Sequence, residues 1–392
     1  MDPRRNPFAP GAGSRPPELA GRADILEGVA IALDRIRAGR HAQSYILIGL
    51  RGVGKTVLLN EMRRAAEGAG LHCVPIEAPE GQTLPAILVP ALRTALLKLD
   101  RGQAALTVAK KGLGALARFV KAFKLSYGEL EASINLGDIG VADNGDLDTD
   151  LIDLLDIVGR AAAERGTAMI LFIDELQYVP ERELGALITA LHRARQNERP
   201  ITIVAAGLPQ LPGQMGRAKS YAERLFLFKT IGPLSDAAAS AAIIRPIEDE
   251  DCSITPDALA RILEVTRNYP YFLQEWGKQA WDAAETCPIT RADVDLAYPT
   301  AIAELDDSFF RVRFDRLTPA EKRYLRAMAE LGTEPCSSTA IADVLGRKPS
   351  SFGPLRASLI AKGMIYTPGY GQTAFTVPLF EEFMRRAVPL QQ

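Results

Sequence analysis

The chain has 392 residues, of which 47% are hydrophobic and 24% are charged, and its formal net charge is −2. This length exceeds what one hydrophobic core usually serves, so two or three domains are expected, and the near-neutral charge excludes a protein that is basic throughout. The sequence has no run of about 18 apolar residues and no apolar signal core, which predicts a cytoplasmic protein without a membrane span. The cysteines are widely separated and lack metal-ligand spacing, so we expect reduced thiols: Cys73, Cys252, Cys287 and Cys336.

The first domain is expected to begin after an arm. Residues 1–17 are rich in Pro, Gly and Arg, which predicts an extended arm on the surface. Residues 18–40 then place apolar side chains at helical spacing. We therefore expect one amphipathic helix before the first strand.

Residues 45–59 read YILIGLRGVGKTVLL, a short apolar strand, a glycine-rich turn and the start of a helix. The turn fits the phosphate-binding pattern G-x-x-x-x-G-K-[ST] at every fixed position. Its glycines let backbone N–H groups surround phosphate oxygens, Lys55 would reach the β- and γ-phosphates, and the Thr56 hydroxyl would bind Mg²⁺. The residues predicted to hold the nucleotide here are Gly49, Arg51, Gly52, Val53, Gly54, Lys55, Thr56 and Val57.

Residues 71–76 then predict a strand and residues 84–99 an amphipathic helix, but residues 100–150 break the alternation. Within this insert, residues 109–124 form a basic amphipathic pattern that suits a membrane surface, a protein partner or packing against a neighbouring domain. Residues 124–141 predict a small hairpin or loop. The aspartate-rich stretch that follows lacks the glycine of a calcium loop, so an acidic turn leading into a helix over 148–164 is expected.

A second apolar strand, AMILFIDE at residues 168–175, ends in two carboxylates. Such a continuous run is typical of a central parallel strand, and ligands bind at the carboxyl ends of such strands. Asp174 would then hold the Mg²⁺ shell and Glu175 would polarise the attacking water. Together with the glycine-rich turn, this strand predicts an ATPase or GTPase core.

The core continues with a helix over 183–196, a strand over 201–205 and a short strand over 225–228. Strands alternating with helices predict an α/β fold with a parallel sheet covered on both faces. Beyond residue 234 only helical patterns remain, at 236–243, 256–265, 271–284 and 291–303. The expected domains are thus a P-loop core over 18–233 and an all-helical lid over 234–305.

Residues 306–392 predict a winged helix-turn-helix, because helices over 319–331, 338–345 and 350–362 precede two short strands. The third helix would be the recognition helix. Between residues 311 and 363 ten Lys/Arg face five acids, a local charge of +5. Because winged helices also pack against proteins, both DNA contact and protein interaction stay open. The residues expected to face outward and contact DNA are Ser350, Ser351, Arg356 and Lys362.

With GLRGVGKT, ILFIDELQ, a helical lid and a terminal winged helix in place, the chain resembles the AAA+ ATPases of the STAND and initiator-like (origin-recognition and archaeal-ATPase) group. The resemblance implies that Gly21-Arg22 folds against the adenine and that Pro270 contacts the base. It also implies that Arg224, or less favourably Arg217, acts on the nucleotide of a neighbouring protomer. The polar sensor of the fourth strand is missing, since Ala205, Ala206 and Gly207 stand there, unless Gln210 reaches in. Arg267 would be a second sensor or simply the end of a helix.

These observations predict an enzyme that hydrolyses ATP slowly, binds ATP or ADP with Mg²⁺, and positions a winged helix on duplex DNA. The alternative is a signalling ATPase in which the winged helix locks the protein or binds a protein partner. The 100–150 insert is a possible site for a protein partner, and a third hypothesis, remodelling of a membrane-bound or protein substrate, would use its basic helix over 109–124. A nucleotide-dependent oligomer formed through Arg224 is compatible with the first. ATP is preferred over GTP only by the resemblance.

Overall fold

In the computed structural model, which describes all residues except 12, 100–105, 124–144 and 390–392, five strands form one parallel sheet. Their order is β2-β3-β4-β1-β5, so β1 lies between β4 and β5. The register pairs Ile46 with Ala205 and Glu77 with Asp174. The strands are β1 (Ser44–Ile48), β2 (His72–Glu77), β3 (Met169–Asp174), β4 (Ile201–Gly207) and β5 (Phe226–Thr230). The predicted parallel α/β sheet is confirmed.

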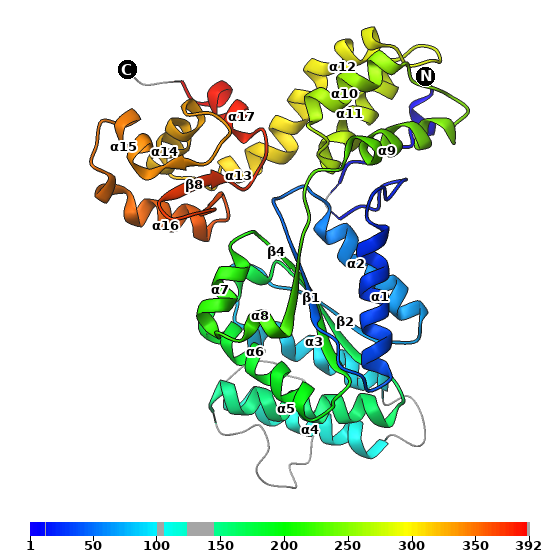
Figure 1. The fold of residues 1–392 in the computed structure, drawn as a ribbon, viewed down its shortest axis with the longest axis vertical. Helices are drawn as coiled ribbons and strands as arrows, with labels where there is room; N and C mark the ends of the chain where they lie inside the picture. The colour runs from blue at the N-terminus through cyan, green and yellow to red at the C-terminus, as the bar shows by residue number, and fades with distance from the viewer. Residues whose placement is uncertain (12, 100–105, 124–144, 390–392) are drawn as a thin grey trace.

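Helices cover both faces of the sheet, and the alternation of strand side chains explains why (Figure 1). In β3, Ile170 and Phe172 join the core beneath α1 (Ala23–Arg37) and α2 (Lys55–Gly68). Leu171 and Ile173 point to the other core. That second core is closed by α3 (Leu84–Leu99), α4 (Leu106–Ala122), α5 (Leu147–Glu164) and α6 (Glu181–Gln196). A strand buried on both faces requires the continuous apolar sequence found here.

The basic helix of the insert is α4, and the apolar side chains described in its second half pack inside the protein. Leu116 and Phe119 are fully buried in the core shared with α3 and α5. The expectation was packing against a neighbouring domain, whereas α4 packs against α3 and α5 within the P-loop core itself. The predicted hairpin over 124–141 lies outside the described residues. Asp146 caps α5 as the acidic turn predicts, because its side chain accepts a hydrogen bond from the Thr149 N–H.

The lid consists of α9 (Asp236–Glu248), α10 (Pro256–Thr266), α11 (Pro270–Ala283) and α12 (Arg291–Glu304). Its core surrounds the fully buried Trp276. The N-terminal arm, which includes the short helix η1 (Pro3–Arg5), lies along the lid. The Trp281 indole N–H donates to the Asp2 carbonyl at 3.1 Å, and Phe8 is only 4% exposed. The sequence predicted an extended arm lying on the surface, but part of the arm is packed into the lid.

A π-helix, η3 (Leu305–Arg311), and α13 (Val312–Phe314) connect the lid to the C-terminal domain. That domain has a three-stranded antiparallel sheet of order β6-β8-β7, as a winged helix requires. β6 and the last helix were not predicted. The elements are α14 (Pro319–Glu330), β6 (Cys336–Ser337), α15 (Ser338–Val344), η4 (Pro349–Phe352), α16 (Gly353–Ala361), β7 (Ile365–Tyr366), β8 (Gln372–Phe375) and α17 (Phe380–Ala387).

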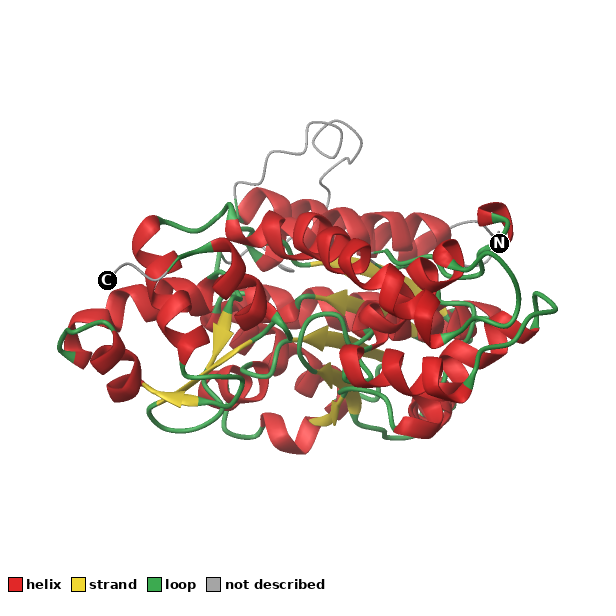
Figure 2. Ribbon diagram, turned by 90° about the horizontal axis from the view of Figure 1, so that it is seen from above, coloured by secondary structure: helices red, strands yellow, loops and turns green. Residues whose placement is uncertain are grey.

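In Figure 1 the lid and the winged helix lie side by side above the sheet, and Figure 2, seen from above, shows the two termini toward opposite ends of the molecule. The lid and the winged helix each make a backbone hydrogen bond to the glycine-rich turn. The Tyr271 N–H of the lid donates to the Gly52 carbonyl at 3.2 Å. The Arg51 N–H donates to the Thr376 carbonyl of the winged helix at 3.0 Å. Among the described helices, none combines the length and hydropathy needed to cross a membrane.

Candidate nucleotide site

The glycine-rich turn between β1 and α2 has the backbone that a phosphate loop needs. Gly52 and Gly54 have φ of 83° and 88°, in the left-handed region that side chains disfavour. Gly54 is the residue before α2, so the helix begins at Lys55 with its first N–H groups at the turn. A hypothetical Cβ on Gly49 would lie 2.1 Å from the Ile231 carbonyl oxygen, so no larger residue fits there.

Lys55 is buried in this turn, with 8% of its surface exposed. Its Nζ donates to the carbonyl oxygens of Gly49 at 3.0 Å and Leu50 at 2.9 Å. Burial lowers the pKa of Lys55 to about 8, although the nearby Glu175 carboxylate favours the charged form. The ammonium is thus fixed at the turn but poorly neutralised, which suits the binding of a polyphosphate.

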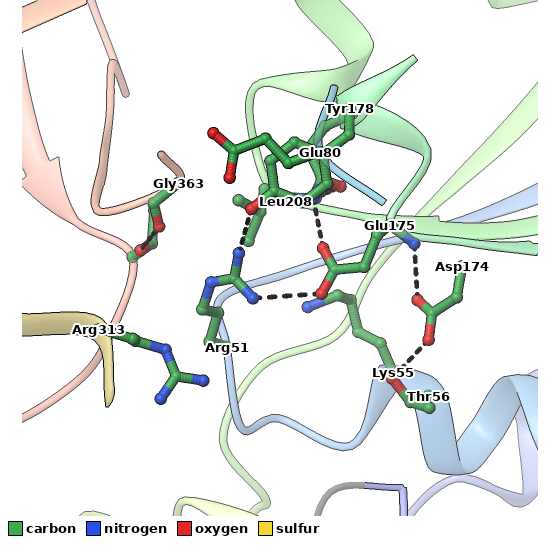
Figure 3. Close-up of polar contacts among 12 residues, drawn as sticks. Arg51, Lys55, Thr56, Glu80, Asp174, Glu175, Tyr178, Leu208, Arg313 and Gly363 are labelled. Atoms are coloured by element: carbon green, nitrogen blue, oxygen red, sulfur yellow. Dashed lines mark hydrogen bonds and ion pairs between the residues drawn. The ribbon is translucent and has the colours of Figure 1, made fainter. Parts of the chain in front are cut away.

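Thr56 and Asp174 meet at the end of β3. The Thr56 hydroxyl donates to Asp174 Oδ2 at 2.6 Å, and burial raises the pKa of the Asp174 carboxyl (Figure 3). A hydroxyl beside a carboxylate offers the hard oxygen ligands that Mg²⁺ prefers. The donor set therefore fits Mg²⁺, which Thr56 and Asp174 would hold.

The Glu175 carboxylate is engaged at both oxygens (Figure 3). Arg51 Nη1 lies 3.2 Å from Oε1, and the Gln177 amide donates to Oε2. Arg51 also donates to the Tyr178 hydroxyl at 2.7 Å, and Gln177 Oε1 accepts from the Leu208 N–H at 3.1 Å. Glu175 itself has φ of 54°, a strained conformation for a non-glycine residue. In this state the predicted base is held by protein groups on both sides.

A cavity of about 1530 Å³ surrounds these groups, larger than the roughly 300–1,000 Å³ of typical ligand pockets. Besides Lys362 of the winged helix, four parts of the chain supply most of its lining. They are the N-terminal arm from Phe8 onward, the glycine-rich turn with β2 and β3 ends, the lid from Pro270, and the connecting segment from Glu304 to Arg316. The arm and the connecting segment were not predicted to contribute.

The residues implied by the family resemblance are divided between the cavity and its surroundings. Arg22 and Pro270 line the cavity, and burial lowers the pKa of Arg22, which donates to the Gly232 carbonyl. Gly21 has φ of 67°, and a Cβ there would lie 2.7 Å from Ala238 of the lid. This glycine lets the start of α1 approach the lid closely.

Arg224 lies at the end of α8 (Ala222–Leu225), where its side chain is exposed. The next strand starts at Phe226, which pairs with Ser44 at the start of β1, whereas the phosphate turn follows the other end of β1. Arg224 is therefore remote from the phosphate turn of its own chain. Arg217, at the end of α7 (Leu211–Ala218), is paired with Glu181 at 3.0 Å.

Two sensor candidates lie away from the cavity lining. Gln210 precedes α7, and its Oε1 is buried without a hydrogen-bond partner in the described part of the chain. Gln177 instead bridges Glu175 and the end of β4. Arg267 ends α10 with φ of 50° and pairs with Glu381 and Glu382 of α17 at 3.4 and 3.0 Å. Arg267 thus ends a helix, which is one of the two roles expected for it, and it also pairs with the winged-helix domain.

The predicted DNA-contacting residues are also divided. Ser350 and Ser351 are exposed in η4, before α16. Arg356 is half-buried and donates to Thr373 Oγ1 at 3.0 Å and the Gln372 carbonyl at 3.0 Å, so it fixes the wing.

Lys362 faces inward, and the expectation that it faces outward is wrong. Its Nζ donates to Glu321 Oε2 at 2.8 Å and to the Arg316 carbonyl at 3.0 Å, and it lines the cavity. Burial opposes ionisation of Glu321, but hydrogen bonds from Lys362, Thr318 and Ser358 lower its pKa to about 2. A local charge count could not show that this cation was already paired.

Sequence reasoning missed Arg313, in α13. Its guanidinium points toward the glycine-rich turn and Arg51 (Figure 3). It stacks on the Phe309 ring, 4.4 Å from the centroid, and donates to the Phe309 carbonyl. Burial lowers the pKa of Arg313 to about 10, and the positive charge of Arg51 acts in the same direction. No local motif marks this arginine, because the contact depends on how the domains pack.

The winged helix closes against the same site. A Cβ on Gly363, just after α16, would lie 2.9 Å from Arg51 Nη2 and 3.0 Å from the Tyr178 hydroxyl oxygen. Thr376 is fully buried and its hydroxyl donates to the carbonyls of Gly363 and Met364. The C-terminal end of the recognition helix is therefore docked on the core, while its N-terminal end stays exposed.

Family models match two parts of the chain. Residues 18–204 match the AAA ATPase domain, and residues 307–384 match a domain of unknown function (DUF8462). A curated relative is an uncharacterized HTH-type transcriptional regulator of Methanocaldococcus jannaschii. It is 24% identical over 214 residues, which are 53% of this chain and 52% of the relative. The chain thus spans about half the length of that relative.

Similar solved structures extend over nearly the whole chain. The Walker-type ATPase of Pyrococcus abyssi aligns over 95% of this chain and 97% of its own, with a TM-score of 0.60 and 15% identity. Orc1 of Aeropyrum pernix in complex with DNA aligns over 97% and 96%, with a TM-score of 0.48 and 15% identity. The first likeness shows a shared fold from the arm to the winged helix.

Proposed function

We propose that this chain, whose residues 18–204 form an AAA ATPase domain, is an ATP-driven switch that sets the position of its winged helix. ATP would be held by Gly49, Arg51, Gly52, Val53, Gly54, Lys55, Thr56 and Val57, with Arg22, Gly21 and Pro270 at the base end. Mg²⁺ supplies charge neutralisation for the polyphosphate when bound. Glu175 would take the proton of the attacking water.

The observation that carries this proposal is the docking of the winged helix on the phosphate turn itself. The Arg51 N–H bonds Thr376, and the Arg51 side chain holds Glu175 while lying against Gly363. A base held in this way must be freed before it can accept a proton, which supports slow hydrolysis in the docked state. A nucleotide that binds the undocked state more tightly would release both the base and the winged helix.

DNA is the partner that the exposed end of the winged helix favours. Arg347, Lys348, Ser350 and Ser351 are all exposed immediately before α16, the end that enters a major groove in such domains. The curated relative is named an HTH-type transcriptional regulator, which supports the same partner. Arg224 would act on a neighbouring protomer if ATP assembles the protein on DNA.

The second candidate, a signalling ATPase locked by its winged helix, is favoured by the inward pairing of Lys362 and the buried contact of Thr376. In that case the docked domain is an internal lock and its release exposes a surface for a protein. DNA binding separates the two candidates.

The test is binding of duplex DNA, followed by fluorescence anisotropy, with a non-hydrolysable ATP analogue or with ADP. We expect tighter binding with the analogue and a fall of about 10-fold or more between low and moderate salt. The double substitution Arg347→Glu with Lys348→Glu should abolish binding. Arg323→Glu, an exposed cation on α14, serves as the control. Binding that is unchanged in the double variant refutes the DNA role.

The ATPase part is tested separately. Lys55→Ala should abolish nucleotide binding, and Glu175→Gln should bind ATP without turnover. An unchanged hydrolysis rate in Glu175→Gln would remove that residue from its assigned role.

A further inference from the structure

We propose that Arg313, supplied by the segment between lid and winged helix of the same chain, recognises the terminal phosphate of ATP. This inference rests on the proposed function and names a residue that neither the phosphate turn nor the lid motif contains. It makes the connecting segment, and with it the winged helix, sensitive to whether that phosphate is present.

The position of Arg313 is fixed by a stack that starts at the phosphate turn. The Tyr271 N–H bonds the Gly52 carbonyl at 3.2 Å, and the Tyr271 ring stacks on Phe309 with centroids 4.6 Å apart. The guanidinium of Arg313 lies over the other partner of that stack, 4.4 Å from the Phe309 centroid. A Cβ on Gly52 would lie 3.4 Å from Cζ of the Phe309 ring and 3.4 Å from the Tyr271 Cβ. The turn, the two rings and the arginine therefore form one continuous packed unit.

The direction of the side chain is toward the phosphate end of the site. Arg313 and Arg51 lie on the same side of the turn, and Arg51 reaches Glu175 (Figure 3). Arg313 lines the same cavity as Arg51, Tyr271, Glu175 and Tyr178, and after burial these are, in this order, the groups that act on its pKa. Since Glu175 is the predicted base, Arg313 faces the end of the polyphosphate at which water attacks.

Three cations that line the cavity are paired with carboxylates, whereas Arg313, within the residues that the structure describes, is not. Arg51 is paired with Glu175, Arg316 with Glu80, and Lys362 with Glu321. Arg313 has no carboxylate within ion-pair distance among the described residues. Burial and the neighbouring Arg51 both lower its pKa, so its charged form is under-compensated in the nucleotide-free protein. A phosphate oxygen matches a guanidinium geometrically and would relieve this cost.

The lid arginine is not available for the same task. Arg267 is turned to Glu381 and Glu382 of α17. Loss of the terminal phosphate would remove the partner of Arg313, so the position of the connecting segment would differ between the ATP-bound and the ADP-bound protein. The difference in affinity between the two nucleotides is the energy available to shift the winged helix.

The experiment compares Arg313→Ala with Arg311→Ala. Arg311 is two residues away in the connecting segment, but it is 61% exposed and pairs with Asp307 at 3.1 Å. Calorimetry would measure binding of a non-hydrolysable ATP analogue and of ADP. Arg313→Ala should weaken the analogue about 10- to 100-fold and ADP less than about 3-fold, whereas Arg311→Ala should change neither. Equal losses for both nucleotides, or no loss, would overturn the proposal.

Two further measurements keep the outcomes distinct. Lys55→Ala should lose both nucleotides, and if it binds like the wild type, the proposed ATP site itself is wrong rather than the role of Arg313. Nucleotide-free Arg313→Gln should melt no lower than the wild type, because the substitution removes an under-compensated buried charge. A clearly lower melting temperature together with equal losses of affinity for both nucleotides would show that Arg313 is a structural residue and would refute its role as a phosphate sensor.

Discussion

The docking of the winged helix can be tested at Gly363, a position where one methyl group discriminates between two states. Gly363 has φ of 63°, and an added Cβ would lie 2.9 Å from Arg51 Nη2, 3.0 Å from Tyr178 Oη and 3.2 Å from Leu208 Cδ1. All three neighbours belong to the ATPase core. Gly363→Ala therefore introduces an overlap that exists only while the winged helix is docked.

The expected magnitude follows from separating two costs. Placing alanine in the left-handed region costs about 1 kcal/mol, and this applies to the docked and undocked states alike. Overpacking at an interface costs about 1–3 kcal/mol and applies only to the docked state. The docked population should therefore fall by about 5- to 100-fold relative to the undocked one. In the proposed switch, undocking frees Glu175 from Arg51. Basal ATP turnover should therefore rise as the docked population falls.

The assay is hydrogen exchange of a peptide containing Arg51, whose N–H is bonded to Thr376 in the docked state, together with the basal turnover rate. Gly346→Ala is the matched control. Gly346 also follows a helix of the winged domain with φ of 61°, but a Cβ there would meet nothing within 4 Å. If both variants exchange and turn over alike, backbone strain explains the result and the docking argument fails.

Two further predictions concern groups that line the same cavity. The pKa of Lys55 is lowered from its ordinary 10.5 to about 8 in the nucleotide-free protein. Between these two pH values the unfolded chain binds more protons than the folded one, so the contribution of Lys55 to the free energy of unfolding rises with pH. A bound polyphosphate favours the charged lysine, so ATP binding near pH 8.5 should take up protons, measured by calorimetry in buffers of different ionisation enthalpy; absence of uptake would contradict the assignment. Phe8→Ala should destabilise the lid by about 3 kcal/mol, because Phe8 is 4% exposed and packs on Gly277, and urea denaturation should show it. Tyr370→Ala, at a fully exposed aromatic residue, should leave the same transition unchanged.

The elements of the fold were predictable wherever a local pattern determined them. The glycine-rich turn, the strand ending in Asp174 and the amphipathic helix α3 each carry their signal within a few neighbouring residues. The short helix α8 and the two-residue strand β6 lack such a signal and are formed through tertiary packing, whereas α17 has Phe380, Phe383 and Met384 at helical spacing, a signal that the prediction overlooked.

The residues of the candidate site were also predictable only where a local sequence pattern marks them. Lys55, Thr56 and Asp174 lie together because a P-loop and the end of a parallel strand share one sheet edge. Arg313 and Phe8 reach the cavity only through the packing of the connecting segment and the arm, which no local spacing encodes. Lys362 was misjudged because its partner Glu321 lies on a different helix, at a contact that charge counting does not reveal.

The proposed coupling between nucleotide and domains requires no long pathway, because the contacts involved belong to four consecutive residues, 49–52. The carbonyls of Gly49 and Leu50 hold the Lys55 ammonium, the Arg51 N–H holds the winged helix, and the Gly52 carbonyl holds the lid. A polyphosphate that draws Lys55 away from those carbonyls acts on a turn whose next two peptide groups bond to two other domains. Any rearrangement of the turn therefore changes both contacts at once. The turn proposed to bind the phosphates therefore also contacts the lid, through the Gly52 carbonyl, and the winged helix, through the Arg51 N–H.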